Sequence, residues 1–235
     1  MKRLLIFSLI LNVLLASGIA YMVHRLGGWN YALYRLRSGE AGLYTHRKTL
    51  FEKLPERPGA VVMLGDSQTS LCEWQELLGD SIRVLNRGIS GDYVNGVWGR
   101  LGEVLRHKPL KIFLLIGVND LFLGNEPEAI EARYREIVQK IRRDSPDSEL
   151  ILQSVLPVNG TVRSLPAGNV EIQALNVRIA QIAKDYALPY VDLYSQLTDV
   201  SGDLSARFTD DGIHLNGMGY LVWKKEIEKV IGDER

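Results

Sequence analysis

The sequence lacks the features of several common protein classes. Among its 235 residues there is one cysteine, Cys72, so no disulfide can form within the chain. Basic and acidic side chains number 28 each, and the formal net charge of zero leaves no basic excess that would indicate nucleic-acid binding. Internal repeats and low-complexity tracts are also missing. The length is sufficient for one domain with a substantial core.

The N-terminal segment is uncharged and mostly apolar between residues 4 and 23, with basic residues on both sides. About twenty apolar residues can span a bilayer as a helix, whereas Ala16-Ser17-Gly18 resembles a signal-peptide cleavage site. Residues 1–25 are therefore predicted to be an N-terminal membrane anchor or a signal peptide. We favour a retained anchor, because the apolar run continues past residue 18. The remaining chain is then expected on the extracytoplasmic side at the cell envelope, or secreted or periplasmic if the N-terminus is cleaved.

Residues 26–58 are predicted to be a juxtamembrane connector. Trp and Tyr residues in this stretch are interrupted by basic ones, a composition that suits a helix lying partly in the membrane interface. Pro55 and Pro58 end the connector and mark the boundary of the following domain, predicted to comprise residues 59–235.

Apolar runs and helical periodicity alternate through this domain. Predicted strands cover residues 60–64, 82–86, 111–117, 150–155 and 188–192, and predicted helices include residues 71–78, 130–141, 172–186 and 220–231. Such alternation with short connections indicates a parallel sheet with helices on both faces. The predicted fold class is α/β: a three-layer α/β/α sandwich around a flavodoxin-like, five-stranded parallel sheet, preceded by an N-terminal hydrophobic helix.

Polar residues cluster where the predicted strands end. The clusters are Gly65-Asp66-Ser67, residues 86–92, Gly117-Val118-Asn119-Asp120 and, before the last helix, residues 210–216. The carboxyl ends of parallel strands meet at one edge of a sheet, where α/β proteins bind their ligands. The opposite edge has no comparable set of polar residues, so the sequence predicts an active site at the carboxyl edge.

The clusters contain the groups that acyl transfer requires. Ser67 is the candidate nucleophile, and His214 is the one histidine that falls within a cluster. Asp211 stands three residues before His214, a spacing at which its carboxylate can accept from one imidazole nitrogen while the other faces the serine. Asp210 is the competing candidate for that carboxylate. His107 follows a predicted helix, where a contact with the helix C-terminus is the expected role.

The same clusters offer donors for an oxyanion. Gly88 has no side chain and allows a backbone N–H to approach a reacting carbonyl, and Asn119 can supply a side-chain amide. The alternative is that Asp66, Ser67 and Asn119 cap helices and that Gly88 belongs to an ordinary turn. Each alternative is reasonable by itself, but four clusters at the same sheet edge favour catalysis.

These four clusters, in this order, resemble the SGNH hydrolase superfamily, also called GDSL-type esterases. Gly65-Asp66-Ser67 is similar to the block with the nucleophile, Gly88 and Asn119 to the oxyanion positions of the next two blocks, and Asp211 with His214 to the last block. The resemblance covers roughly residues 60–231. It implies a triad of Ser67, His214 and Asp211, and an oxyanion hole formed by the Ser67 N–H, the Gly88 N–H and the Asn119 side chain.

Two further expectations come from this resemblance. Gln68 stands where the family often has Leu or Ile, and it is expected to line the pocket and favour a polar substrate. Residues 86–120 look most like the branch of platelet-activating-factor acetylhydrolase subunits and sialate O-acetylesterases, which implies short acyl groups, acetyl in particular.

The leading hypothesis is a serine hydrolase that removes short acyl groups from a carbohydrate or lipid at the cell envelope through an acyl-enzyme. It implies a small-molecule or glycan acyl ester as partner, contact with the membrane through the N-terminal helix, and no metal or organic cofactor. The alternatives are a lysophospholipase or thioesterase acting on longer chains, and an envelope O-acyltransferase. A flavodoxin-like binding module is disfavoured, because no glycine-rich phosphate loop follows the first predicted strand.

Overall fold

The computed structural model describes residues 2–25 and 40–232, which fall into two compact units divided between Leu43 and Tyr44. The first unit contains helix α1 (Lys2–Arg25). Its stretch Lys2–Tyr21 has a mean hydropathy of 2.2 and none of it is buried within the protein. By length and composition this helix can serve as a membrane anchor or a signal sequence.

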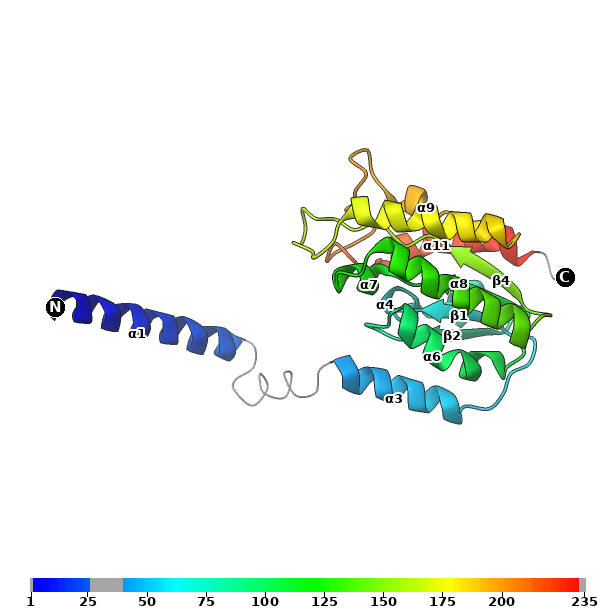
Figure 1. The fold of residues 1–235 in the computed structure, drawn as a ribbon, viewed down its shortest axis with the longest axis horizontal. Helices are drawn as coiled ribbons and strands as arrows, with labels where there is room; N and C mark the ends of the chain where they lie inside the picture. Colours follow the sequence, from blue (N-terminus) through cyan, green and yellow to red (C-terminus); the bar gives the residue numbers. More distant parts are fainter. Residues whose placement is uncertain (1, 26–39, 233–235) are drawn as a thin grey trace. The chain divides into compact units, whose positions relative to one another are not determined.

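The second unit is built on a five-stranded parallel sheet in the order β2-β1-β3-β4-β5 (Figure 1). The strands are β1 (Val61–Gly65), β2 (Val84–Gly88), β3 (Lys111–Leu115), β4 (Glu149–Gln153) and β5 (Tyr190–Val191). This is the strand order of flavodoxin-like folds, so the predicted fold class is confirmed. Strands β1 and β3 lie in the middle and are apolar, because both of their faces are covered by helices.

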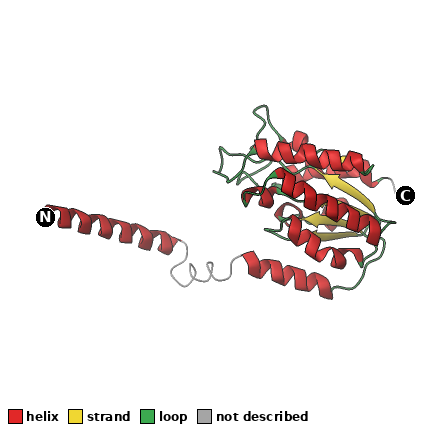
Figure 2. Cartoon of the chain, viewed as in Figure 1, coloured by secondary structure: helices red, strands yellow, loops and turns green. Residues whose placement is uncertain are grey.

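Helices cover both faces of the sheet (Figure 2). The larger ones are α6 (Val94–Leu105), α8 (Pro127–Asp144), α9 (Asn169–Asp185) and α11 (Gly217–Ile231), and the shorter ones are α4 (Ser67–Ser70), α5 (Trp74–Leu78), α7 (Val118–Phe122) and α10 (Tyr194–Leu197). Val62 and Leu64 of β1 pack with α6, α8 and α9, whereas Val61 and Met63 pack with α5 and α11. The alternation of side chains along β1 thus divides the core into two layers.

The predicted helix over residues 71–78 is wrong at its start. Residues 71–73 are not helical, and the helix is interrupted between α4 and α5. The Trp74 indole N–H donates to the Thr69 carbonyl at 2.8 Å. The side-chain amide of Asn86, at the end of β2, donates to the carbonyls of Ser70 (3.2 Å) and Cys72 (3.0 Å). These side chains bind carbonyls that a continuous helix would use for its own hydrogen bonds.

Helix α3 (Glu40–Lys53) occupies much of the predicted connector, whose residues 26–39 lie outside the described part of the chain. From Tyr44 onward α3 belongs to the second unit, and Phe51 is buried there. The compact unit therefore starts earlier in the chain than the boundary that Pro58 suggested. The reason is that α3 buries an aromatic residue against β2, which the polar composition of the connector did not indicate.

Candidate active site

Ser67 is the first residue of α4, directly beyond the sharp turn that ends β1. Asp66 caps α4, its Oδ1 accepting the Gln68 N–H at 2.9 Å. A Cβ atom at Gly65 would lie 2.2 Å from the Leu115 carbonyl oxygen, so only glycine fits between β1 and β3 at this point. The turn holds the half-buried Ser67 at the carboxyl edge of the sheet.

Ser67, His214 and Asp211 form one hydrogen-bonded chain. His214 Nε2 lies 3.0 Å from Ser67 Oγ, and His214 Nδ1 lies 2.7 Å from Asp211 Oδ2. With Nδ1–H donating to the carboxylate, Nε2 is free to accept the serine proton. Asp210, the competing candidate, is exposed and has no hydrogen bond to His214 among the described residues.

The second oxygen of Asp211 fixes the loop that carries the histidine. Asp211 Oδ1 accepts the backbone N–H groups of Ile213 (2.9 Å) and His214 (2.8 Å). Partial burial opposes ionisation of Asp211, but hydrogen bonds from the His214 side chain and from these two N–H groups outweigh it and lower its pKa to about 2. Asp211 is therefore a carboxylate throughout the neutral pH range.

Gln68 does not line a pocket, contrary to the expectation from its position. Its side chain is buried, and its amide donates to the Ile213 carbonyl at 2.6 Å. The Gln68 carbonyl in turn accepts the hydroxyl of Tyr220, on α11, at 2.8 Å. Gln68 therefore ties the nucleophile helix to the loop of His214, which keeps the serine and the imidazole at hydrogen-bonding distance.

The Gly88 N–H, predicted to face an oxyanion, is already bound. It donates to Asn86 Oδ1 at 2.9 Å. A Cβ atom at Gly88 would lie 2.2 Å from the Ser70 backbone nitrogen, so this glycine is needed for the close packing of β2 against α4. The predicted donor role of Gly88 does not agree with this geometry, because its N–H points to a side chain of its own strand.

Three other N–H groups at this edge have free hydrogens. The backbone N–H groups of Ser67 and Gly91 have no hydrogen-bond partner within the described residues. The Asn119 side-chain amide uses one hydrogen for the Asp92 carbonyl at 2.8 Å and retains the other. Gly91 precedes Asp92 and has a φ of +76°, a conformation that favours glycine. Gly91 stands in the same sequence cluster as Gly88, but it lies in the loop beyond β2 rather than within the strand.

A buried set of acidic residues lies beneath this edge, and the sequence pattern did not predict their burial. Asp92 Oδ2 pairs with Arg100 Nε at 2.8 Å, and Arg100 Nη2 donates to the Gly65 carbonyl at 3.1 Å. The Asp120 carboxylate accepts the Val94 N–H at 3.0 Å. Burial raises the pKa of Asp120 to about 6 and, with neighbouring Asp92 and Asp120, raises that of Asp66 to about 7. The ion pair joins the loop after β2 to the end of β1.

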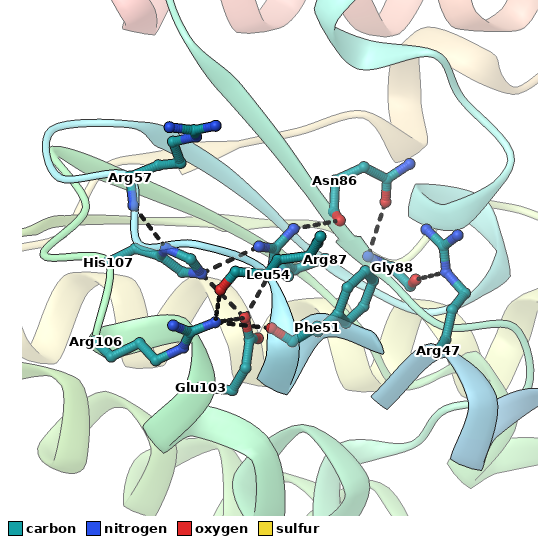
Figure 3. A network of polar contacts seen from close by, with 10 residues as sticks. All are labelled: Arg47, Phe51, Leu54, Arg57, Asn86, Arg87, Gly88, Glu103, Arg106 and His107. Atoms are coloured by element: carbon teal, nitrogen blue, oxygen red, sulfur yellow. Dashed lines mark hydrogen bonds and ion pairs between the residues drawn. The ribbon is translucent and has the colours of Figure 1, made fainter. Parts of the chain in front are cut away.

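His107 lies in a buried polar network rather than at a helix carbonyl (Figure 3). Its Nε2 is 3.0 Å from Glu103 Oε1 and 3.1 Å from Arg87 Nη2, and its Nδ1 accepts the Arg57 N–H at 3.1 Å. Desolvation lowers the pKa of His107, although Glu103 opposes this shift. Across residues 2–25 and 40–232, no group of three or more His, Cys, Asp or Glu side chains is arranged to hold a metal ion.

Known proteins share the sequence pattern and the fold. Residues 57–222 match the GDSL-like Lipase/Acylhydrolase family. The Escherichia coli K12 protein named thioesterase 1/protease 1/lysophospholipase L1 is 26% identical over 167 residues, which cover 66% of this chain and 75% of that protein. A Streptococcus pneumoniae structure, provisionally described as a platelet activating factor, is 27% identical with a TM-score of 0.76, covering 87% of this chain and 100% of its own. A GDSL-like lipase from Bacteroides thetaiotaomicron shares the fold at 23% identity, with a TM-score of 0.69 and coverage of 80% and 96%.

Proposed function

This chain belongs to the GDSL-like lipase/acylhydrolase family of ester hydrolases, and on that premise we propose that Ser67, His214 and Asp211 are its catalytic triad. The observation that carries the proposal is the hydrogen-bonded chain from Ser67 Oγ through the imidazole to Asp211, with distances of 3.0 and 2.7 Å. Among the described residues, His214 is the histidine within hydrogen-bonding distance of this serine.

The proposed reaction has two halves. Ser67 Oγ attacks the ester carbonyl while His214 Nε2 takes its proton, and Asp211 stabilises the imidazolium that forms. The tetrahedral intermediate collapses as the imidazolium returns the proton to the leaving alcohol, which leaves an acyl-serine. A water molecule then attacks the acyl-serine while His214 Nε2 takes a proton from it. The second tetrahedral intermediate collapses as the imidazolium returns this proton to Ser67 Oγ, and the carboxylic acid departs.

The oxyanion of each tetrahedral intermediate needs preorganised donors. We assign this role to the N–H groups of Ser67 and Gly91 and to the Asn119 amide. The support is that these hydrogens have no acceptor in the part of the chain that the structure describes, whereas the Gly88 N–H is bound to Asn86. Gly91 replaces Gly88 in this assignment.

For the substrate we propose a short acyl ester, acetyl in particular, on a carbohydrate or lipid of the cell envelope. The resemblance of residues 86–120 to platelet-activating-factor acetylhydrolase subunits and sialate O-acetylesterases supports a small acyl group. The second candidate is a longer-chain thioester or lysophospholipid, which the name of the Escherichia coli relative favours. Both candidates use the same triad and differ in the acyl group that is accepted.

For the location we propose that residues 1–25 are retained as an anchor, with the hydrolase unit extracytoplasmic. The exposed apolar helix of mean hydropathy 2.2 supports this assignment. Protease treatment of intact spheroplasts tests it: digestion of the hydrolase unit without lysis is expected, and protection until lysis would contradict the proposed orientation.

The substrate is tested with the full chain in detergent, using p-nitrophenyl acetate and p-nitrophenyl octanoate, with Ser67→Ala as the control. Preference for acetate that disappears in the Ser67→Ala variant is expected. Preference for octanoate would keep the mechanism and favour the longer-chain candidate. Addition of a sugar acceptor, with separate measurement of acylated sugar and free acid, distinguishes hydrolysis from acyl transfer.

A further inference from the structure

Arg47 on α3 reaches the end of β2, which leads to the loop of residues 89–92 that contains Gly91 and is called the oxyanion loop below. Its Nε donates to the Gly88 carbonyl at 3.0 Å (Figure 3). The guanidinium lies 5.0 Å from the centroid of the Phe51 ring, one turn along the same helix. Phe51 is 4% exposed, and Arg87 of β2 lies over its ring at 4.5 Å. The side chain of Arg47 is therefore held in place by a buried aromatic residue.

The peptide group that Arg47 contacts is linked directly to the nucleophile turn. The carbonyl belongs to Gly88, and the N–H of the same peptide group belongs to Ile89, which donates to the Gly65 carbonyl at 3.1 Å. Gly65 is the last residue of β1 and precedes Asp66 and Ser67. One peptide group thus separates the Arg47 guanidinium from the strand end that carries the nucleophile.

A second link runs through the other side of Gly88. Its N–H donates to Asn86 Oδ1, and the Asn86 amide donates to the carbonyls of Ser70 and Cys72 after the nucleophile. The backbone of Gly88 also packs closely on the Ser70 backbone. A displacement of the Gly88 carbonyl would therefore shift Gly65, which precedes α4, and the carbonyls of Ser70 and Cys72 at its C-terminal end.

The charge of Arg47 forms no ion pair with the residues that the structure describes. Arg87 pairs with Glu103 and Arg100 with Asp92, but within the described residues Arg47 has no carboxylate within 4.0 Å. Desolvation and the nearby Arg87 and Arg100 lower the pKa of Arg47, and the Glu73 carboxylate partly opposes this shift. The half-buried Arg47 guanidinium donates to a peptide carbonyl, which is a charge-assisted hydrogen bond that polarises the peptide group.

We propose that Arg47 is a positioning residue for catalysis, holding the Gly88–Ile89 peptide group so that the oxyanion loop and the Ser67 turn keep their relative geometry. The proposal rests on the proposed function. It assigns a catalytic contribution to a helix that lies outside the residues 57–222 matched by the family. Loss of Arg47 should act on the acylation step, since small displacements of reacting groups reduce rates strongly.

Arg106 provides a matched control. Its Nη2 donates to the carbonyls of Phe51 (2.8 Å) and Leu54 (2.7 Å) at the C-terminal end of α3. This contact also attaches α3 to the hydrolase unit, but it does not touch the Gly88–Ile89 peptide group. Arg106→Gln therefore weakens the attachment of the helix, whereas Arg47→Gln weakens the attachment and removes the contact under test.

The experiment compares the full-length wild type with Arg47→Gln, Arg47→Lys and Arg106→Gln in detergent. It measures the rate of fluorophosphonate labelling, kcat and KM for p-nitrophenyl acetate, and Tm. For Arg47→Gln we expect labelling rate and kcat to fall by about tenfold, up to the roughly hundredfold loss of a 1 Å misplacement, with KM within about twofold of wild type. Arg47→Lys keeps a charged donor and should retain an intermediate kcat.

The control separates positioning from stability. The proposal predicts that Arg106→Gln keeps kcat near the wild-type value even where its Tm falls as far as that of Arg47→Gln. Equal kcat in wild type and Arg47→Gln would overturn it, as would kcat losses in the two variants that follow Tm alone. A folded wild type that neither labels nor hydrolyses esters would instead overturn the proposed function, and this inference with it.

Discussion

Asp66, the residue before the proposed nucleophile, should make the protein less stable as pH rises. Its carboxyl group is fully buried, with Oδ1 bound to the Gln68 N–H and Oδ2 without a partner among the described residues. Desolvation raises its pKa from 3.8 to about 7, the Gln68 N–H opposes the shift, and Asp92 and Asp120 add to it. Asp66→Asn removes the titrating group and keeps the acceptor that caps α4.

The sign and size follow from the pKa values of the two states. Because the folded-state pKa exceeds the unfolded value of about 3.9, the folded protein binds more protons in between. The contribution of Asp66 to stability is therefore fully present below about pH 4 and is lost as pH rises through about 7. A gap of about three pKa units, at about 1.4 kcal/mol each, gives a loss on the order of 4 kcal/mol. Asp66→Asn should be more stable than wild type at pH 8, by up to that amount.

Urea unfolding of the full chain at several pH values between 5 and 8 measures this difference. Tryptophan fluorescence reports the transition, since Trp74 and Trp223 are fully buried. Asp147→Asn, which removes an exposed carboxylate, serves as the control and should follow the wild-type pH dependence. If the unfolding free energies of wild type and Asp66→Asn fall in parallel over this range, the account of Asp66 is wrong.

Three further predictions concern the site. Asp211→Asn should lower kcat for p-nitrophenyl acetate by about ten thousandfold, as in other serine triads, and a loss below tenfold would contradict its role. Asn119→Ala should lower kcat by about a hundred- to thousandfold through loss of one oxyanion donor, and unchanged kcat would exclude that role. In thermal unfolding, Gly88→Ala should lose about 1–3 kcal/mol or more, because its Cβ meets the Ser70 backbone. Gly99→Ala, in an open position of α6, should gain about 0.5–1 kcal/mol, and equal Tm values would refute the packing argument.

The fold could be predicted because its central strands are short apolar runs that are recognisable in the local sequence. The apolar runs at 61–65 and 112–115 are buried on both faces, which is typical of the middle of a parallel sheet. The break between α4 and α5 could not be predicted, because it depends on carbonyls bound by Asn86 from a distant strand. Nothing local marks that contact. Phe51 is a similar case, since its burial on β2 is not visible in the polar segment around it.

The part of the site that could be predicted consists of residues placed directly after strands, at the carboxyl edge of the sheet. Ser67, His214 and Asp211 lie in one hydrogen-bonded chain, and their chemical roles stay predictions. Gly88 and Gly91 stand in one cluster, and only the backbone geometry distinguishes a bound N–H from a free one. The Asp92–Arg100 pair joins a loop to a helix face, a contact for which the sequence has no spacing rule.

Ser67 is proposed to be a nucleophile that His214 activates. Intact-mass and peptide mass spectrometry of the full chain after treatment with a fluorophosphonate, with His214→Ala in parallel, tests it most directly. We expect one adduct per chain, located on Ser67, whose formation is slowed by several orders of magnitude in His214→Ala. A folded wild type without an adduct, an adduct on another residue, or equal labelling rates in both proteins would contradict the claim.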